Sequence, residues 1–218
     1  MILPRQYTLP LLWVVLFSAF LLTRLSNAYT DKSFHTVLSS RFEHSIPAGE
    51  VVTGFHLKQP IDWNLLYKDA LSQDDSNAVC VSVLLANYNN RKNDGSFSLS
   101  LQVDSHRHRT VVDAKTVLDN AYRRICYDNL LLRDVANKSA AIIVEGIDSR
   151  PGRAITTWMT KDAIHGGAVL NNRTLPDRSL TFRIDTKRSD GKKRIHAIIL
   201  TIICGMSGTL LFSIHRHT

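Results

Sequence analysis

Two apolar stretches without a charged residue bracket the chain, Leu9 to Leu22 near the start and Ala197 to Ile214 at the end. At 1.5 Å of rise per residue, the second stretch makes a helix of roughly 27 Å, close to the thickness of a bilayer's hydrocarbon core. Basic and imidazole side chains at 192–194 and 215–217 flank it. Such side chains suit the two membrane interfaces, so the pattern predicts a transmembrane helix over residues 197–214.

The first stretch has two interpretations, which the sequence leaves open. Small residues at Ser26 and Ala28 are typical of a signal-peptidase site, so residues 1–28 fit a signal peptide that is removed. Arg24 lies where removable signals are normally uncharged, and this favours an uncleaved signal anchor over the same residues.

The orientation of the intervening region follows from the first segment, against one contrary signal. The run from Lys187 to Arg194 is strongly basic, and the positive-inside rule prefers such runs in the cytoplasm. The first segment nevertheless has the architecture of an export signal and usually dominates, so we expect an extracytoplasmic middle region, with a bacterial inner membrane and periplasm favoured. The expected divisions are an anchor or signal at 1–28, a lead-in at 29–49, a domain at 50–186, a basic juxtamembrane segment at 187–196 and a span at 197–214.

The middle region has the pattern of short strands. Apolar runs and alternating apolar and polar residues are typical of strands, and the segments with these patterns are 78–86, 96–103, 140–145, 154–160 and 179–184. Asp94-Gly95, between the first two, suits a hairpin turn. Only Trp63 to Leu71 and Ala114 to Leu118 have helical patterns. Because long helical crossovers are missing, the spacing predicts a mainly β fold, an antiparallel β-sandwich flanked by the two transmembrane helices.

Charge and cysteine usage add two expectations. The formal net charge of +8 indicates acidic neighbours, and an exported, tethered domain meets anionic lipid or acidic polysaccharide before nucleic acid. A solvated basic surface is the simpler explanation of the same charge. Cys80 and Cys126 fit either a disulfide, which an oxidising compartment permits, or two buried free thiols.

One order of segments resembles a known kind of module. The segments concerned are, in order, Gly54-Phe55, the apolar strand from Val79 to Ala86, the stretch from Asn87 to Gly95 leading into Phe97-Ser98-Leu99, then Leu118-Asp119-Asn120 and a strand with Trp158. They resemble, over residues 50–184, a β-sandwich module of bacterial envelope proteins. That module is similar to carbohydrate-binding jelly rolls and is often attached to glycosyltransferase-like proteins with many spans. The resemblance implies a jelly-roll-like, extracytoplasmic sandwich beside sugar chemistry, with a glycan or a multi-span membrane protein as partner.

Side-chain chemistry indicates which residues would hold a glycan. Sugars are bound by aromatic faces and by planar amide or carboxylate groups that pair with hydroxyls. One loop concentrates such groups, namely Tyr88, Asn89, Asn90, Arg91, Asn93 and Asp94. Trp63 and Trp158 add candidate stacking surfaces. Ordinary turn chemistry for the loop and burial for the tryptophans are the alternatives.

Catalysis finds little support in the sequence. No GxSxG, GxxxxGK[ST] or GxGxxG motif occurs, and His106-Arg107-His108-Arg109 lacks a third ligand nearby, so no cofactor and no metal are expected. Asn137 and Asn172 begin glycosylation acceptor patterns, which matter in a eukaryotic or viral host. The sequence therefore favours a noncatalytic binding module of the cell envelope. The alternatives are an accessory subunit of a membrane glycosyltransferase and a host-directed or viral membrane glycoprotein.

Overall fold

The computed structural model describes residues 17, 34–40, 45–67, 76–88, 91–128 and 130–188. The chain divides into two units, and one of them, residues 34–188, contains every strand that the structure describes. The expected segment at 1–28, apart from residue 17, lies outside the described residues, as do residues 189–196 and the expected span at 197–214. Within the described ranges, no helix is both long and apolar enough to cross a bilayer.

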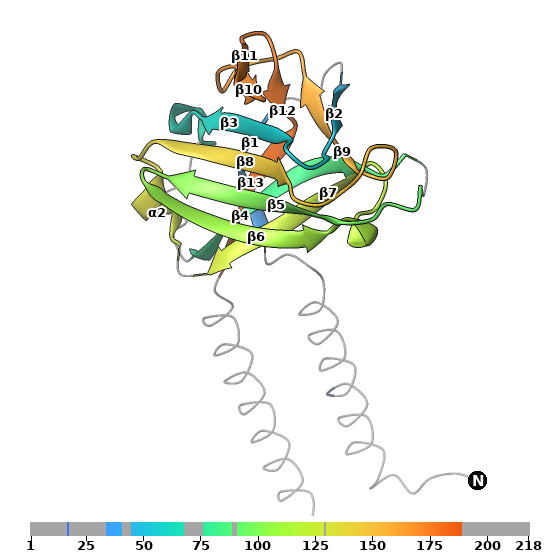
Figure 1. The fold of residues 1–218 in the computed structure, drawn as a ribbon. Helices are drawn as coiled ribbons and strands as arrows, with labels where there is room; N and C mark the ends of the chain where they lie inside the picture. Colours follow the sequence, from blue (N-terminus) through green and yellow to red (C-terminus); the bar gives the residue numbers. More distant parts are fainter. Residues whose placement is uncertain are drawn as a thin grey trace, which may run out of the picture. The chain divides into compact units, whose positions relative to one another are not determined.

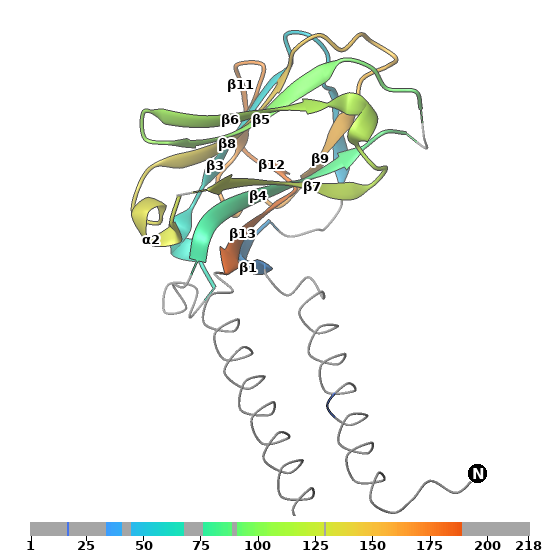
Figure 2. The same cartoon turned by 90° about the horizontal axis from the view of Figure 1, so that it is seen from below.

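The described unit is built from two antiparallel sheets. The first contains β1 (Phe34–Ser39), β2 (Ile46–Glu50), β4 (Ser76–Ala86), β7 (Ala121–Asp128), β9 (Thr156–Thr160), β12 (Ser179–Leu180) and β13 (Phe182–Arg188). The second contains β3 (His56–Ile61), β5 (Ser96–Val103), β6 (His106–Asp113), β8 (Ala140–Gly146), β10 (Ala168–Leu170) and β11 (Arg173–Leu175). Figures 1 and 2 show the sheets as two layers, which confirms the predicted mainly β, sandwich-like architecture.

Side chains from both layers fill the space between the sheets. β5 presents Phe97, Leu99 and Leu101 to this core, since alternate residues of a strand face the same side. β4 contributes Val79, Val81, Val83 and Leu85 from the opposite sheet. Each of these side chains is at most 1% exposed. The apolar alternation in the sequence therefore marks the inner face of each sheet.

The predicted strands are confirmed, and the predicted helices are shorter than expected. Trp63 to Leu71 was expected to be helical, but only η1 (Trp63–Leu65) forms, as a single 3-10 turn. Leu66 is already extended, and Tyr67 N–H donates to the Val37 carbonyl of β1 at 2.9 Å, which draws the chain out of the helix. Residues 68–71 lie outside the described residues. The second predicted helix is likewise a single turn, η2 (Ala114–Thr116).

The predicted hairpin between β4 and β5 is wrong. β4 belongs to the first sheet and β5 to the second, so the loop between them crosses from one layer to the other. Asp94-Gly95 does form a turn, with Gly95 at φ +77°, but the turn packs against Ser149. A Cβ on Gly95 would lie 2.7 Å from Ser149 Cα, so glycine is needed for close packing as well as for the backbone angle. β5 instead forms a hairpin with β6.

The sandwich begins earlier than the expected boundary at residue 50. β1 pairs with β13, Phe34 opposite Lys187, and β2 pairs with β9. Val37 and Leu38 of β1 are 0% exposed, which explains why this segment is held in the sheet. The lead-in predicted at 29–49 therefore includes two strands, and the start of the basic run, through Arg188, lies in β13.

A buried histidine links the β9–β10 loop to the first sheet. His165 is 3% exposed and its ring lies 5.0 Å from that of Phe182. Its Nε2–H donates to the Ser39 carbonyl at 3.3 Å, because a carbonyl oxygen only accepts. Nδ1 is buried and has no partner among the described residues. Burial lowers the pKa of His165, against a smaller opposite effect of Ser39, Asp62 and Asp162.

We expect this histidine to make stability fall in mild acid. The unfolded chain takes up a proton near pH 6.5, the ordinary pKa, whereas the folded chain resists it, so stability falls as the pH drops below that value. The slope from this residue is at most about 1.4 kcal/mol per pH unit. Urea unfolding at pH 7.5 and 5.5 measures it, and His165→Leu should reduce the difference. An undiminished difference in that variant would assign the acid sensitivity to other groups.

Candidate functional site

The loop between β4 and β5 forms one wall of a pocket at the end of the sandwich. Asn87, directly after β4, holds the loop's first turn to the segment that follows η2. Its backbone N–H donates to Asp119 Oδ1 at 2.8 Å, and its side-chain Nδ2 donates to the Val117 carbonyl at 3.1 Å. These bonds place the loop beside residues 114–119, which come from the other sheet's edge. The pocket therefore joins segments that are distant in sequence.

The second half of the loop is anchored to the β8–β9 connection. Arg153 Nη1 lies 3.0 Å from Asp94 Oδ2, and Asp94 N–H donates to the Arg153 carbonyl at 3.0 Å. Ser149 Oγ donates to the Asp94 carbonyl, also at 3.0 Å. Asp94, predicted to bind a ligand, is thus occupied in holding two loops together.

Arg91 is also occupied by neighbours within the protein. Its guanidinium lies 2.5 Å from Glu50 Oε1 and 4.6 Å above the ring of Tyr88. Glu50 Oε2 accepts a further hydrogen bond from Gly152 N–H at 2.8 Å. This carboxylate therefore neutralises Arg91 and links β2, the β4–β5 loop and the β8–β9 connection. Tyr88 is 40% exposed and has φ +55°.

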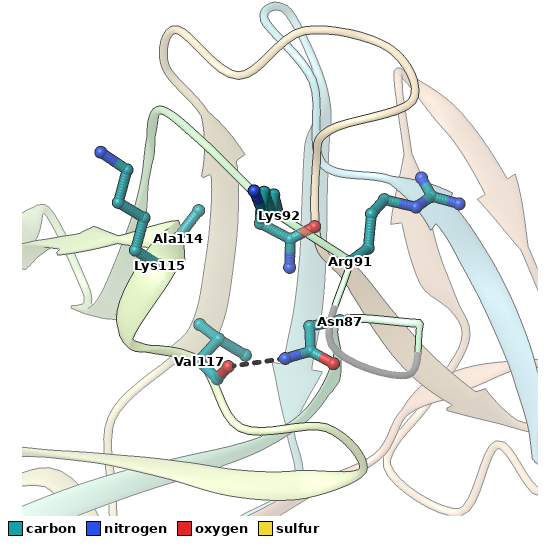
Figure 3. Close-up of a pocket in the computed structure, with 7 residues that line it drawn as sticks. Asn87, Arg91, Lys92, Ala114, Lys115 and Val117 are labelled. Atoms are coloured by element: carbon teal, nitrogen blue, oxygen red, sulfur yellow. Dashed lines mark hydrogen bonds between the residues drawn. The ribbon is translucent and has the colours of Figure 1, made fainter.

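The pocket itself has a volume of about 270 Å³. Residues from two segments line it, the β4–β5 loop and the stretch following β6: Asn87, Arg91, Lys92, Asn93, Ala114, Lys115 and Val117. Figure 3 shows Ala114, Lys115 and Val117 across from the loop residues, and it shows the Arg91 guanidinium pointing away from Lys115. The side chains of Lys92 and Lys115 are exposed, whereas Ala114 and Val117 are buried in the wall.

Asn93 is the most unusual residue of this pocket. It is 5% exposed, and its Oδ1 is buried without a hydrogen-bond partner among the described residues. Within the same residues, its Nδ2 makes no hydrogen bond either, although its backbone N–H donates to the Arg91 carbonyl at 2.7 Å. Buried polar groups are nearly always paired in folded proteins. Because this carboxamide also lies in a pocket wall, it is a candidate group for contact with a ligand.

The two tryptophans have different positions. Trp63 is 9% exposed and belongs to the core, beyond the end of β3 where Ile61 pairs with Ala140. The pocket lies at the opposite end of β8, where Gly146 pairs with Phe97. Trp63 is therefore remote from the loop, and its side chain packs in the core.

Trp158, in contrast, lies next to the pocket wall. Its indole N–H donates to Asn120 Oδ1 at 3.0 Å, and Asn120 follows the Asp119 that holds Asn87. The indole is partly exposed. Asn89 and Asn90, also predicted as ligand-binding, lie outside the described residues.

The remaining candidate residues lie elsewhere in the described unit. Cys80 and Cys126 form a disulfide between β4 and β7. Asn137 is an exposed residue following α2 (Leu132–Val135), and Asn172 is exposed in the β10–β11 turn. His106 to Arg109 lie at the start of β6, where Arg107 pairs with Glu145. Within the part of the chain that the structure describes, no three His, Cys, Asp or Glu side chains are grouped so that they could hold a metal ion.

Lys92, Lys115 and Asn87 were not among the residues predicted to bind a ligand. Lys115 lies in η2, which the pairing of Ser96 with Asp113 brings to the β4–β5 loop. No local pattern in the sequence predicts which strands pair in this way. Near Lys115, the only local sequence feature that indicates structure is Asp113, a residue type that favours the cap of a helical turn such as η2.

No protein-family model matches the chain, and neither does any curated protein.

Proposed function

We propose that this protein is a membrane-anchored, extracytoplasmic β-sandwich with a jelly-roll-like arrangement, which binds envelope glycan noncatalytically through the pocket beside the β4–β5 loop. The observation that carries the proposal is the unpaired carboxamide of Asn93 in the pocket wall. Planar amides that pair with hydroxyl or carboxylate groups are typical of sugar sites. The partly exposed indole of Trp158, hydrogen-bonded to Asn120, is a candidate stacking surface beside the same wall.

The composition of the wall supports a binding role. Ala114 and Val117 provide an apolar patch, and a few polar groups converge on it from the loop. Small-molecule sites usually combine these two features. The volume of about 270 Å³ suits a single sugar residue or a short part of a chain. The neighbouring carboxylates have structural partners, because Asp113 accepts from Lys115 N–H and Asp119 accepts from Asn87 N–H. This arrangement favours binding over acid–base chemistry.

The disulfide supports the proposed location. Disulfides persist in oxidising compartments and are rare in the cytosol of mesophiles. Cys80 and Cys126 lie directly opposite each other on β4 and β7. Together with the apolar segments at 9–22 and 197–214, this pairing favours an exported domain beside a membrane.

Replacing Asn93 by leucine tests the proposal, because binding and stability are expected to respond in opposite directions. Leucine has nearly the shape of asparagine and removes a buried acceptor that has no partner among the described residues, so stability should be unchanged or higher. Retention of glycans should be lost. The full chain, purified in detergent, is applied to a broad glycan array, and urea unfolding is measured in parallel.

Asn137→Leu is the matched control, since Asn137 is exposed and lies outside the pocket lining. It should leave retention intact. Absence of any retained glycan for the natural protein, or full retention by Asn93→Leu, would overturn the proposed function.

A further inference from the structure

The charged residues that line the pocket are all basic. Arg91 has Glu50 as its counter-ion, and Asp94 pairs with Arg153. Lys92 and Lys115 have neither an ion pair nor a side-chain hydrogen bond within the described residues. Lys92 and Lys115 both belong to the lining of one small pocket. Like charges gathered in a concave site raise the local concentration of anions there.

The nearby carboxylates are committed to backbone and side-chain partners. Asp113 Oδ1 accepts from Lys115 N–H at 2.9 Å. Asp119 accepts from Asn87 N–H through Oδ1 and from Asn120 Nδ2 at 3.3 Å through Oδ2. These bonds engage the carboxylate oxygens of both acids within the protein. The two lysines are therefore the groups left to interact with a ligand.

The unused polar groups of the lining are donors. Each lysine ammonium has three N–H bonds and no acceptor, and Asn93 Nδ2 makes no hydrogen bond within the described ranges. Asn93 Oδ1, a buried acceptor without a partner in the same residues, is an exception. A site that presents donors and positive charge fits a ligand that presents negatively charged acceptors. Ala114 and Val117 complete it with an apolar surface, which suits the C–H face of a sugar ring.

We infer that the pocket selects a sugar residue with an anionic group, a carboxylate or a phosphate, held between Lys92 and Lys115. This inference rests on the proposed function and specifies its ligand class. The anionic group takes the two ammonium charges and the Asn93 Nδ2–H, while the ring lies against Ala114 and Val117. A neutral sugar of the same shape would leave both charges unpaired.

The test compares ligands that differ in the charge of one group and keep the same sugar rings. The full chain in detergent is titrated calorimetrically with oligogalacturonate and with its methyl ester, which keeps the hydroxyl groups and loses the charge. A hexose phosphate is a third ligand and distinguishes phosphate from carboxylate. We expect the acid to bind at least about tenfold more tightly than the ester, since a hydrogen bond to a charged group contributes roughly that factor. Its affinity should fall as salt rises.

Matched lysine variants locate the effect. Lys92→Gln and Lys115→Gln should each weaken the anionic ligand by about three- to tenfold and leave the ester unchanged. Lys138→Gln is the control, because Lys138 is exposed near the start of β8, at the opposite end of the strand from Gly146. Equal binding of acid and ester, or equal losses for all three variants, overturns the anionic selection while the glycan-binding proposal stands. Binding of none of the ligands here, with no retention on the array, overturns both.

Discussion

Replacing Asp185 by alanine is expected to lower the free energy of unfolding by about 3 kcal/mol, the lower end of the cost of breaking a buried ion pair. The Asp185 side chain is 2% exposed and lies on β13. It accepts hydrogen bonds from Thr36 Oγ1 at 2.7 Å, Ser82 Oγ at 2.8 Å and Arg124 Nε at 3.0 Å. One carboxylate therefore links β13 to β1, β4 and β7.

Loss of this carboxylate removes the acceptor of the Thr36 and Ser82 hydroxyl groups. Ser82 is 1% exposed, so its hydroxyl cannot turn to water, and a buried unpaired donor costs about 1–3 kcal/mol. Arg124 is 38% exposed and lies 4.1 Å above the ring of Phe34. Because water reaches its guanidinium, we place the expected cost at the lower end of the range for buried pairs.

Urea unfolding of Asp185→Ala, Asp185→Asn and Asp177→Ala measures the effect. The asparagine variant keeps the shape and one acceptor oxygen, so it should lose less stability than the alanine variant. Asp177 is exposed in the turn before β12, and its replacement should change stability by no more than about 0.5 kcal/mol. A loss for Asp185→Ala as small as the Asp177 value would show that this polar cluster does not stabilise the sheet.

The sequence predicts those strands whose own residues have an apolar or alternating pattern. β4 is apolar on consecutive positions, because Val79, Val81 and Val83 face the core while Ala78 and Cys80 on its other face are also 0% exposed. β5 alternates strictly between apolar and polar residues, and its apolar residues face the core, although Ser98 and Ser100 on the other face are also buried. For these segments the local pattern and the tertiary environment agree, so the prediction succeeds.

The strands that escaped prediction depend on partners distant in sequence. Among the described strands, β6 pairs with β5 alone. Val112 is the only buried residue of β6, and the basic and polar residues of this strand have no strand pattern. β3 contains Lys58, Gln59 and Pro60, yet Gln59 is 0% exposed because its amide donates to the Gly166 carbonyl and accepts from Leu180 N–H. Pairings of this kind decide the structure, and single-sequence patterns do not contain them.

Of the residues that form the pocket, the sequence predicts only those in the β4–β5 loop, because the others also depend on pairings between distant segments. The loop from Tyr88 to Asp94 is rich in turn and amide residues, and this composition predicts a binding loop. Sequence alone could not separate Asn93, whose amide has no partner among the described residues, from Asp94, which Arg153 engages. Nor could it place Lys115 across the pocket, because that neighbour depends on the register of β5 against β6.

Removal of the disulfide is expected to lower the free energy of unfolding by about 4 kcal/mol in the chain-entropy model of a cross-link. Cys80 and Cys126 are 46 residues apart in sequence, and the bond limits the freedom of that loop in the unfolded chain. In the folded state the bond also holds β7, which pairs with β4 alone among the described strands. Cys80→Ala with Cys126→Ala should therefore shift the urea midpoint strongly downward.

Reduction of the natural protein should reproduce this loss, whereas the double variant should not respond to a reductant. Cys204→Ala is the control, because this third cysteine lies outside the disulfide and its loss should leave the response to reductant intact. An unchanged urea midpoint after complete reduction would contradict the prediction.

The two stability predictions should not be additive. Cys80 lies opposite Asp185 in the pairing of β4 with β13, and Arg124 precedes Cys126 by two positions on β7. Without the disulfide, β7 can move and carry Arg124 away from Asp185, so part of the ion pair is already lost. The variant lacking both features should therefore lose less stability than the sum of the separate losses, by about 0.5 kcal/mol or more. A double-mutant cycle in urea measures this difference, and strict additivity would show that β7 keeps its place without the cross-link.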